Sequence, residues 1–142
     1  QMTERLCSCN QQQPLQALIA LRNLTVEAIS TLASNEQKRR IFTILLHKCE
    51  FTDEMCDLRQ QRRDVSLDCN ERIALTLRNA VNRGQLPENL DTARAAITIH
   101  AYIDGILYQW LLAPESFALH QEAERWVDTG LDMLRLSPSL RK

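Results

Sequence analysis

The sequence predicts an all-α fold, a bundle of about six helices around one core. Glycine and proline are scarce, with 3 and 4 among 142 residues, whereas sheets need many turns built from those residues. Leucine, alanine, arginine, glutamine and glutamate, which favour helices, are frequent. Apolar side chains also recur every three or four residues, which places them on one face of a helix. Together these observations predict long helices joined by few connections.

Start and stop signals divide the first third of the chain. Residues 1–10 are polar and resemble the end of a helix that enters from a preceding segment. Pro14 suits the first turn of the next helix. The apolar positions over 15–32 wrap more than one face, which predicts a buried helix. Asn35 is expected to cap a short helix that ends near Glu50.

A long helix is expected next, between Thr52 as its cap and Gly84 as its stop. It would contain about 31 residues and extend roughly 46 Å at 1.5 Å per residue. Its first half, 57–64, is almost entirely polar, and the simplest interpretation is a face exposed to solvent. Its second half carries regularly spaced apolar residues and is expected to be buried.

Two further helices are expected after the loop that follows Gly84. Asp91 should cap a helix that runs from Thr92 to Ala113. Gly105 lies in the middle of that helix and indicates either close packing or a bend, because glycine is unfavourable there. The last helix is expected over about 117–136, with Pro138 ending the ordered chain.

The charge balance argues against nucleic-acid binding by this chain itself. The formal net charge is −1, whereas a DNA-binding domain normally presents a basic face to the phosphates. No apolar run approaches the ~20 residues that span a bilayer, and the first residues lack the apolar core of a signal peptide. We therefore expect a cytoplasmic protein that does not contact membranes. Because the chain begins with Gln1 and not with methionine, we interpret it as part of a longer protein.

The five cysteines favour a reducing compartment. Their number is odd, they form no Cys-x-x-Cys motif, and no histidine lies at a metal-ligand spacing from a pair. Free thiols are the simpler interpretation, although the Cys7-Ser8-Cys9 motif is compatible with metal binding or oxidant sensing. The cysteines are Cys7, Cys9, Cys49, Cys56 and Cys69.

No catalytic constellation is present in the sequence. There is no nucleophile with a recognisable base, no glycine-rich phosphate loop and no metalloprotease motif. His47, His100 and His120 fall on three different expected helices. We therefore predict no enzyme activity, no cofactor and no metal site.

One stripe of side chains on the expected 92–113 helix combines apolar and polar groups. A carboxylate on such a stripe must be paired, protonated, hydrated or reserved for a ligand. Pockets between helices have this composition, with apolar walls and a few polar anchors. The alternatives are that Asp104 pairs with a basic residue or that the stripe faces water. The stripe consists of His100, Ile103, Asp104, Leu107, Tyr108 and Leu111.

The last two helices are the most apolar and each carries a tryptophan. Exposed in a monomer, they would form a larger apolar patch than monomers usually show. Pairing with a second copy would bury them in a four-helix bundle with two-fold symmetry. We expect a homodimer with an interface that includes Tyr102, Ile106, Trp110, Trp126, Leu131 and Leu134.

Several segments resemble the AcrR/TtgR-like branch of the TetR family of transcriptional repressors. The resemblance is specific and covers most of residues 36–142, whereas 1–35 match only loosely. The segments that carry it are Ile44–Met55 (ILLHKCEFTDEM), Arg59–Arg62 (RQQR), Arg83–Pro87 (RGQLP), Ala101–Gly105 (AYIDG) and Trp126–Pro138 (WVDTGLDMLRLSP).

The resemblance implies a division of labour between two domains. Residues 1–142 would be the ligand-binding and dimerisation domain, with 1–10 as the tail of the helix linking it to an absent N-terminal helix-turn-helix domain. Operator DNA would be bound only through that absent domain. The resemblance further implies that small aromatic effectors (flavonoids, phenolics, antibiotics) bind among the middle helices. Their binding would release the dimer from the operator of a multidrug efflux pump.

The family pattern also implies which residues line the pocket. Asp104 matches a polar contact, and Leu45, Cys69, Ile73, Ile103 and Leu107 match wall positions; Ser66 is included with them. Four positions depart from the pattern, with Phe42 for an asparagine, Leu46 for a histidine, His100 for a phenylalanine and Tyr108 for an arginine. Polar anchors are thus lost on one wall and gained on another, so ligand preferences are expected to differ. The rival interpretations are an enzyme or metal-binding bundle, and a dimerisation module without a ligand.

Overall fold

The computed structural model describes residues 17–44 and 56–142, and within them the chain folds into α-helices. No strand occurs among these residues, which confirms the predicted all-α class. Residues 17–44 and 56–142 contain five α-helices, close to the predicted number. The expected helix tail at 1–10 and the cap at Thr52 lie outside the described residues. The elements are α2 (Ala17–Ser34), α3 (Glu36–Thr43), α4 (Cys56–Asn82), α5 (Thr92–Leu112), α6 (Ala123–Leu136) and the 3-10 helix η4 (Pro138–Leu140).

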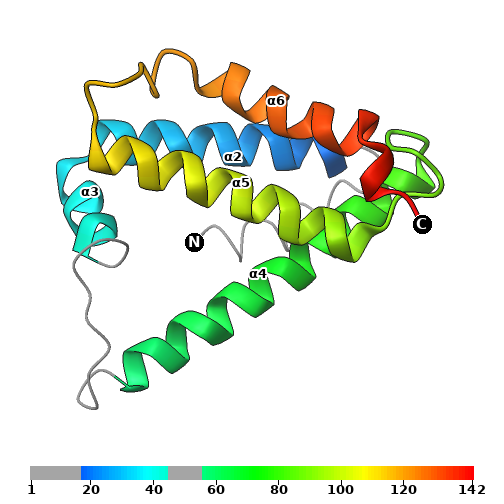
Figure 1. Ribbon diagram of the computed structural model, residues 1–142, viewed down its shortest axis with the longest axis horizontal. Helices are drawn as coiled ribbons and strands as arrows, with labels where there is room; N and C mark the ends of the chain where they lie inside the picture. The colour runs from blue at the N-terminus through cyan, green and yellow to red at the C-terminus, as the bar shows by residue number, and fades with distance from the viewer. Residues whose placement is uncertain (1–16, 45–55) are drawn as a thin grey trace.

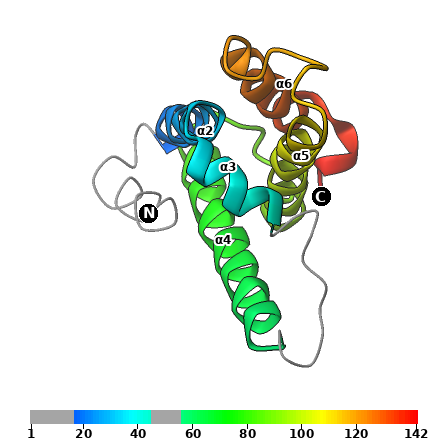
Figure 2. The ribbon, with the colours of Figure 1, turned by 90° about the vertical axis from the view of Figure 1, so that its left-hand side faces the viewer.

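Four helices enclose one hydrophobic core. α4 packs against α5 and α2, and α6 packs against α2 and α5 (Figures 1 and 2). The short α3 contacts one end of α5, while the N-terminal half of α4 projects away from α6 (Figure 1). The largest fully buried side chains come from α2, α4, α6 and the loops on either side of α5: Ile29, Thr76, Leu77, Leu90, Leu119, Val127 and Leu134.

The predicted helix boundaries at Asn35, Gly84 and Asp91 are confirmed. The Lys38 backbone N–H donates to Asn35 Oδ1 at 3.0 Å, and the Arg94 backbone N–H donates to Asp91 Oδ1 at 3.1 Å. Both bonds satisfy an amide that a helix start leaves unpaired. Gly84 follows α4 with a φ of 72°, a conformation that favours glycine.

The last helix begins later than its apolar pattern predicts. α6 starts at Ala123 and not near Phe117. The preceding residues form turns, in which the Ser116 N–H donates to Ala113 O at 3.0 Å and the Leu119 N–H to Phe117 O at 3.1 Å. Leu119 is nevertheless fully buried. The apolar residues of this stretch thus fill the core from a turn, which spacing alone does not distinguish from a helix.

The chain stays ordered beyond Pro138, contrary to the sequence-based expectation. Pro138 opens the 3-10 helix η4 and Leu140 is buried. The Asp91 N–H donates to Leu140 O, and the Lys142 N–H donates to Asn89 O, both at 2.8 Å. These bonds fasten the end of the chain to the loop that precedes α5.

Two contacts fix α6 on its neighbours. The Arg22 guanidinium on α2 donates to both carboxylate oxygens of Asp128 on α6, at 2.7 and 3.1 Å. On the other side, Gly130 allows α6 to approach α5 closely. A methyl group at Gly130 would lie 2.5 Å from Ile99 Cδ1 and 3.0 Å from Tyr102 Cε1.

Gly105 shows no such contact, because a methyl group there would meet nothing within 4 Å. The close packing that Gly105 suggested in the sequence is therefore found at Gly130 instead. Among the described residues, no helix combines the length and apolarity needed to cross a membrane.

The two mid-helix glycines provide a matched test of this packing. Gly130→Ala is expected to lower the free energy of unfolding by about 1 kcal/mol, because overpacking typically costs about 1–3 kcal/mol and the gain in helix propensity is about 1 kcal/mol. Gly105→Ala brings the propensity gain alone and should raise stability by up to about 1 kcal/mol. Urea unfolding of both variants measures the difference, and equal shifts would contradict the assignment.

The Arg22–Asp128 pair predicts a defined pH dependence. Its hydrogen bonds hold the pKa of the Asp128 carboxyl below its usual range. The pair therefore stabilises the fold above the ordinary aspartate pKa of about 4, and this contribution disappears as the pH falls through the lowered value.

Asp128→Asn should therefore cost up to about 1 kcal/mol at pH 7, since the side chain is 48% exposed. The cost should shrink at about pH 2.5, because protonation of the native carboxyl removes its charge. Asp132→Asn is the control, because Asp132 pairs with Arg135 of its own helix. Urea unfolding at the two pH values tests the prediction, which fails if the Asp128 variant loses the same stability at both.

Candidate functional site

The contact surface between α4 and α5 carries a small polar cluster. His100 on α5 and Asn70 on α4 meet with 2.7 Å between His100 Nδ1 and Asn70 Oδ1. On the other side of the ring, His100 Nε2 lies 3.4 Å from Asp104 Oδ2, one turn further along α5. The three side chains form a chain of polar contacts from one helix to the other, which we call the Asn70–His100–Asp104 cluster.

Asp104 lies at the outer end of this cluster. Its side chain is 58% exposed, whereas that of His100 is 20% exposed. Loss of water contact to the surrounding helices nevertheless raises the pKa of the Asp104 carboxyl, and the nearby His100 and Arg62 oppose that rise. The sequence analysis offered pairing with a basic residue as an alternative role for Asp104, and the structure does place His100 and Arg62 near it. More than half of the Asp104 side chain nevertheless remains exposed and accessible to a ligand.

Apolar and weakly polar residues surround the cluster. Ile73 of α4 and Leu107 of α5 are buried, and Cys69 and Ile103 pack against the same core. Burial, together with the negative charge of Asp104, raises the pKa of the Cys69 thiol. The thiol therefore stays protonated at neutral pH, so that it acts as an apolar wall residue of the site and not as a nucleophile.

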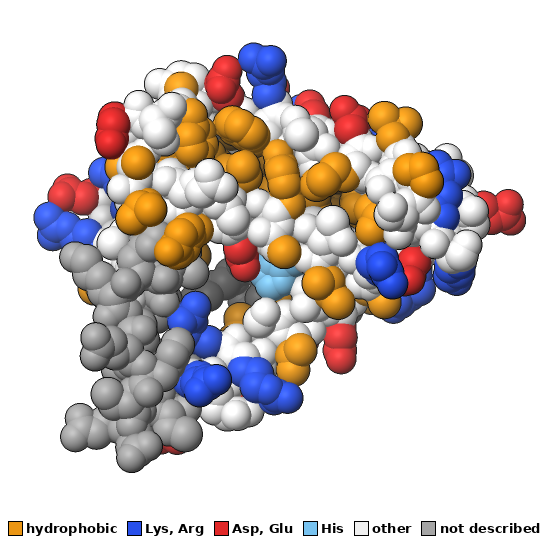
Figure 3. Space-filling view, in the orientation of Figure 1, with side chains coloured by type: hydrophobic (Ala, Val, Ile, Leu, Met, Phe, Trp, Pro, Cys, Tyr) orange, Lys and Arg blue, Asp and Glu red, His pale blue; other side chains and the backbone are white. Residues whose placement is uncertain are grey.

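Six of the predicted pocket residues lie at the contact between α4 and α5, and three others are exposed. Phe42 on α3, Ser66 on α4 and Tyr108 on α5 are exposed. Leu45 and Leu46 lie outside the described residues. In Figure 3 the surface is hollowed between α5 and the projecting half of α4, with acidic, basic and histidine side chains around the hollow. The six that gather are Cys69, Ile73, His100, Ile103, Asp104 and Leu107.

Asn70 and Arg62 belong to the site, although the sequence pattern did not predict them. Asn70 is a polar residue between Cys69 and Ile73 in the apolar half of α4, and its position on that face was the available signal. Arg62 belongs to the polar run that was interpreted as a solvated face. It lies close enough to Asp104 to lower the pKa of that carboxyl, so part of the run faces the site.

The residues predicted for a dimer interface divide into two groups. Leu131 and Leu134 are 2% and 1% exposed, because they fill the chain's own core from α6. Trp110 is also buried, beneath the Arg39 guanidinium at 5.9 Å. These three side chains are therefore not on the surface of the chain, and periodicity alone could not distinguish core from interface.

The other predicted interface residues lie where α5 meets α6. The Tyr102 hydroxyl donates to Trp126 O at 2.8 Å, and the Trp126 ring packs edge-on against Phe117 with 5.4 Å between ring centroids. Tyr102, Ile106 and Trp126 are all partly exposed. Hydrophobic side chains form a band over α5 and α6 in Figure 3, and the most exposed of them on α6 is Leu136.

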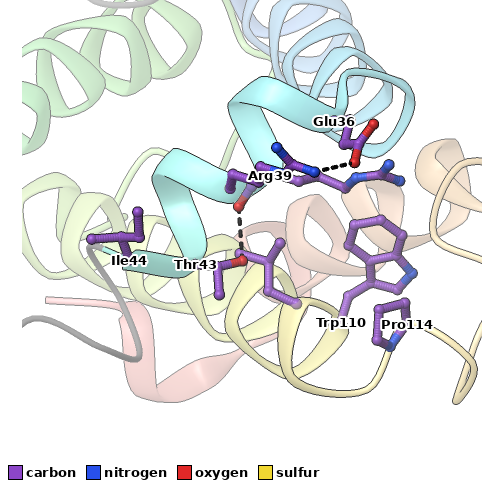
Figure 4. A pocket seen from close by; sticks show the side chains of 8 residues that line it. Glu36, Arg39, Thr43, Ile44, Trp110 and Pro114 are labelled. Atoms are coloured by element: carbon purple, nitrogen blue, oxygen red, sulfur yellow. Dashed lines mark hydrogen bonds and ion pairs between the residues drawn. The ribbon is translucent and has the colours of Figure 1, made fainter.

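A further pocket lies between α3 and the end of α5. Its volume is about 530 Å³, and Arg39, Trp110 and Pro114 are among its lining residues (Figure 4). Two of its charges pair with each other, because Arg40 donates to Glu36 at 2.8 Å, while the Arg39 guanidinium donates to Ala33 O at 3.0 Å. Leu111 of the 92–113 stripe lines this pocket, but none of the residues implied by the family pattern does. Over the described residues, no group of histidine, cysteine and acidic side chains is arranged to hold a metal ion.

Comparison with known proteins places this arrangement in a family. The model for the C-terminal region of MAATS-type transcriptional repressors, a TetR-family domain, matches residues 13–136. The probable HTH-type transcriptional regulator ArpR of Pseudomonas putida is 54% identical over 128 residues, which cover 90% of this chain and 61% of ArpR. The HTH-type transcriptional regulator TtgR of the same species is 55% identical over 122 residues, covering 86% of this chain and 58% of TtgR.

A solved structure agrees with these relatives. The crystal structure of NalD, the secondary repressor of the MexAB-OprM multidrug efflux pump in Pseudomonas aeruginosa, superposes with a TM-score of 0.80 at 28% identity. The match covers 97% of this chain and 66% of NalD. The chain thus spans about three fifths of the length of ArpR and TtgR. On the family match, it belongs to the TetR family of transcriptional repressors, in the region that corresponds to their C-terminal part.

Proposed function

We propose that this chain is the ligand-sensing domain of a repressor of a multidrug efflux operon. The observation that carries the proposal is the Asn70–His100–Asp104 cluster, a polar group set among apolar residues between two helices. Sites for small aromatic molecules combine apolar walls with a few polar anchors in this way. The names of TtgR and NalD as a regulator and an efflux-pump repressor support the same conclusion.

The proposed mechanism is a shift between two conformations of the longer protein. Aromatic effectors (flavonoids, phenolics or antibiotics) would bind near Asp104 and favour the conformation that leaves the operator. An effector shifts this equilibrium only by its difference in affinity for the two states. DNA would be bound by a domain outside residues 1–142, in the cytoplasm, and no step requires an enzyme reaction or a cofactor.

We also propose that two copies pair through α5 and α6. The partly exposed Tyr102, Ile106 and Trp126 and the exposed Leu136 lie on these helices. Burying such a face against its two-fold mate removes apolar surface from water and forms a four-helix bundle. Leu131 and Leu134 would support that bundle from within each chain.

Asp104→Ala should weaken the binding of an effector by about tenfold. A hydrogen bond to a charged group contributes about 1.5–3 kcal/mol, and the open side chain loses part of this to water. Thermal-shift titrations with chloramphenicol and a plant flavonoid measure the effect, because a ligand of the folded state raises its stability. Asp132→Ala, on the far helix α6, is the control. Equal affinities of the Asp104 variant and the control would remove Asp104 from the site.

Leu136→Glu should convert the dimer to monomers without unfolding the chain. Leu136 is 71% exposed, so the new charge does not enter the core of the chain. In a dimer, however, the charge would be buried against the second copy, which is unfavourable. Val65→Glu is the matched control, because Val65 is 61% exposed on the projecting half of α4. Light scattering gives the mass and circular dichroism the fold. A Leu136 variant that keeps the dimer mass would refute this interface.

A further inference from the structure

The distances in the Asn70–His100–Asp104 cluster restrict where its hydrogens lie. An amide oxygen carries no hydrogen, so the 2.7 Å contact to Asn70 Oδ1 requires the hydrogen on His100 Nδ1. Nε2 of the same ring faces the Asp104 carboxylate at 3.4 Å. A bare Nε2 and a carboxylate are both acceptors and repel each other. A second hydrogen between Nε2 and Asp104 Oδ2 removes this repulsion and makes the contact attractive.

A second arrangement satisfies the same side chains with one proton fewer. If the Asn70 amide turns over, its NH2 group donates to Nδ1, and the neutral ring carries its single hydrogen on Nε2. That hydrogen is then donated to the Asp104 carboxylate. A donor faces an acceptor at both contacts of the cluster in either arrangement. The His100–Asp104 pair carries no net charge in the first and one negative charge in the second.

The surroundings allow both states to be populated. The His100 ring has little contact with water, so its hydrogen bonds matter, whereas Asp104 is open to a ligand. Positive charge from Arg62 favours the negative state, and burial near the carboxylate favours the neutral one. Elsewhere α5 meets α6 through Tyr102 and α3 through Trp110, away from the pair. Of the charged groups on α4, Arg62 acts on Asp104, and Asp68 and Arg72 act on Cys69, which itself interacts with Asp104. Tyr108 lies one turn beyond Asp104 on α5.

We propose that the Asn70–His100–Asp104 cluster is a one-proton charge switch that lets a single site bind aromatic cations in its negative state and aromatic anions in its neutral state. This inference rests on the proposed function, because it concerns the same ligand site. A cation next to Asp104 expels the shared proton to the solvent. An anion draws one proton from the solvent into the pair. The site thereby adjusts its own charge by one unit to match its ligand.

The switch predicts that the affinities for the two classes of ligand depend on pH in opposite directions. The affinity for a cation should rise with pH and the affinity for an anion should fall, each by up to about tenfold per pH unit when a whole proton is exchanged. An uncharged ligand should bind with little exchange. A fixed carboxylate without the histidine would instead disfavour anions over the whole neutral range.

Calorimetry in two buffers of different ionisation enthalpy counts the protons exchanged on binding. The probes are ethidium as the cation, 1-anilinonaphthalene-8-sulfonate as the anion and chloramphenicol as the uncharged compound. We expect proton release with ethidium and uptake with the sulfonate near neutral pH. His100→Phe should abolish both exchanges, and His120→Phe, which removes an exposed histidine elsewhere, should abolish neither. Proton counts that do not change in His100→Phe would overturn the switch while leaving the proposed function intact.

If none of the three probes binds, that result contradicts the proposed function. The charge switch can then still be tested by a measurement that needs no ligand. Nitrogen-15 NMR of the imidazole identifies which ring nitrogen of His100 carries hydrogen, with His100→Phe assigning the signal. We expect the share of native rings with hydrogen on Nδ1 to grow as the pH falls through the neutral range, and the Asn70→Leu ring to carry hydrogen on Nε2 alone at neutral pH. A native ring whose hydrogen positions do not change over this range, or change in the same way in Asn70→Leu, would overturn the inference.

Discussion

The packing of α5 against α4 and α6 is the constraint on which the rest of the structure depends. One side of α5 meets α6 so closely that Gly130 has no room for a methyl group beside Ile99. A second side meets α4 and contributes Leu107 to the core. Since side chains on a helix point in fixed directions, the residues left toward the outer part of α4 are His100 and Asp104. The position of the candidate site thus follows from how the core is filled.

Much of the fold could be predicted because its signals are local. Asn35 and Asp91 cap helices with their own side chains, and Gly84 adopts a backbone conformation that other residues avoid. Spacing alone could not identify what covers each apolar side chain. Leu119 fills the core from a turn, and Leu134 fills it from the helix that was expected to pair with a second copy. Periodicity indicates that a helix face is buried, but it does not show whether the same chain or a second copy buries it.

The candidate site divides in the same way. The spacing along one helix placed His100 and Asp104 on a common stripe, and the structure finds them in contact. Asn70 is 30 residues away in sequence, so only the packing of α4 on α5 shows that it holds the ring. The polar run that includes Arg62 was expected to be solvated, yet its charge acts on Asp104. Pairing between helices is a tertiary property, and one sequence carries no direct signal for it.

The electrostatics of Asp104 favour a ligand role over a purely structural one. Its pKa is raised in the folded chain, chiefly by loss of water contact. A carboxyl with a raised folded pKa stabilises the fold at low pH, and this contribution is lost as the pH rises through the raised value. Because the Asp104 side chain is 58% exposed, solvent reduces this effect on stability. The same exposure leaves the carboxylate accessible, so that a ligand that donates a hydrogen or brings a positive charge can pair with it.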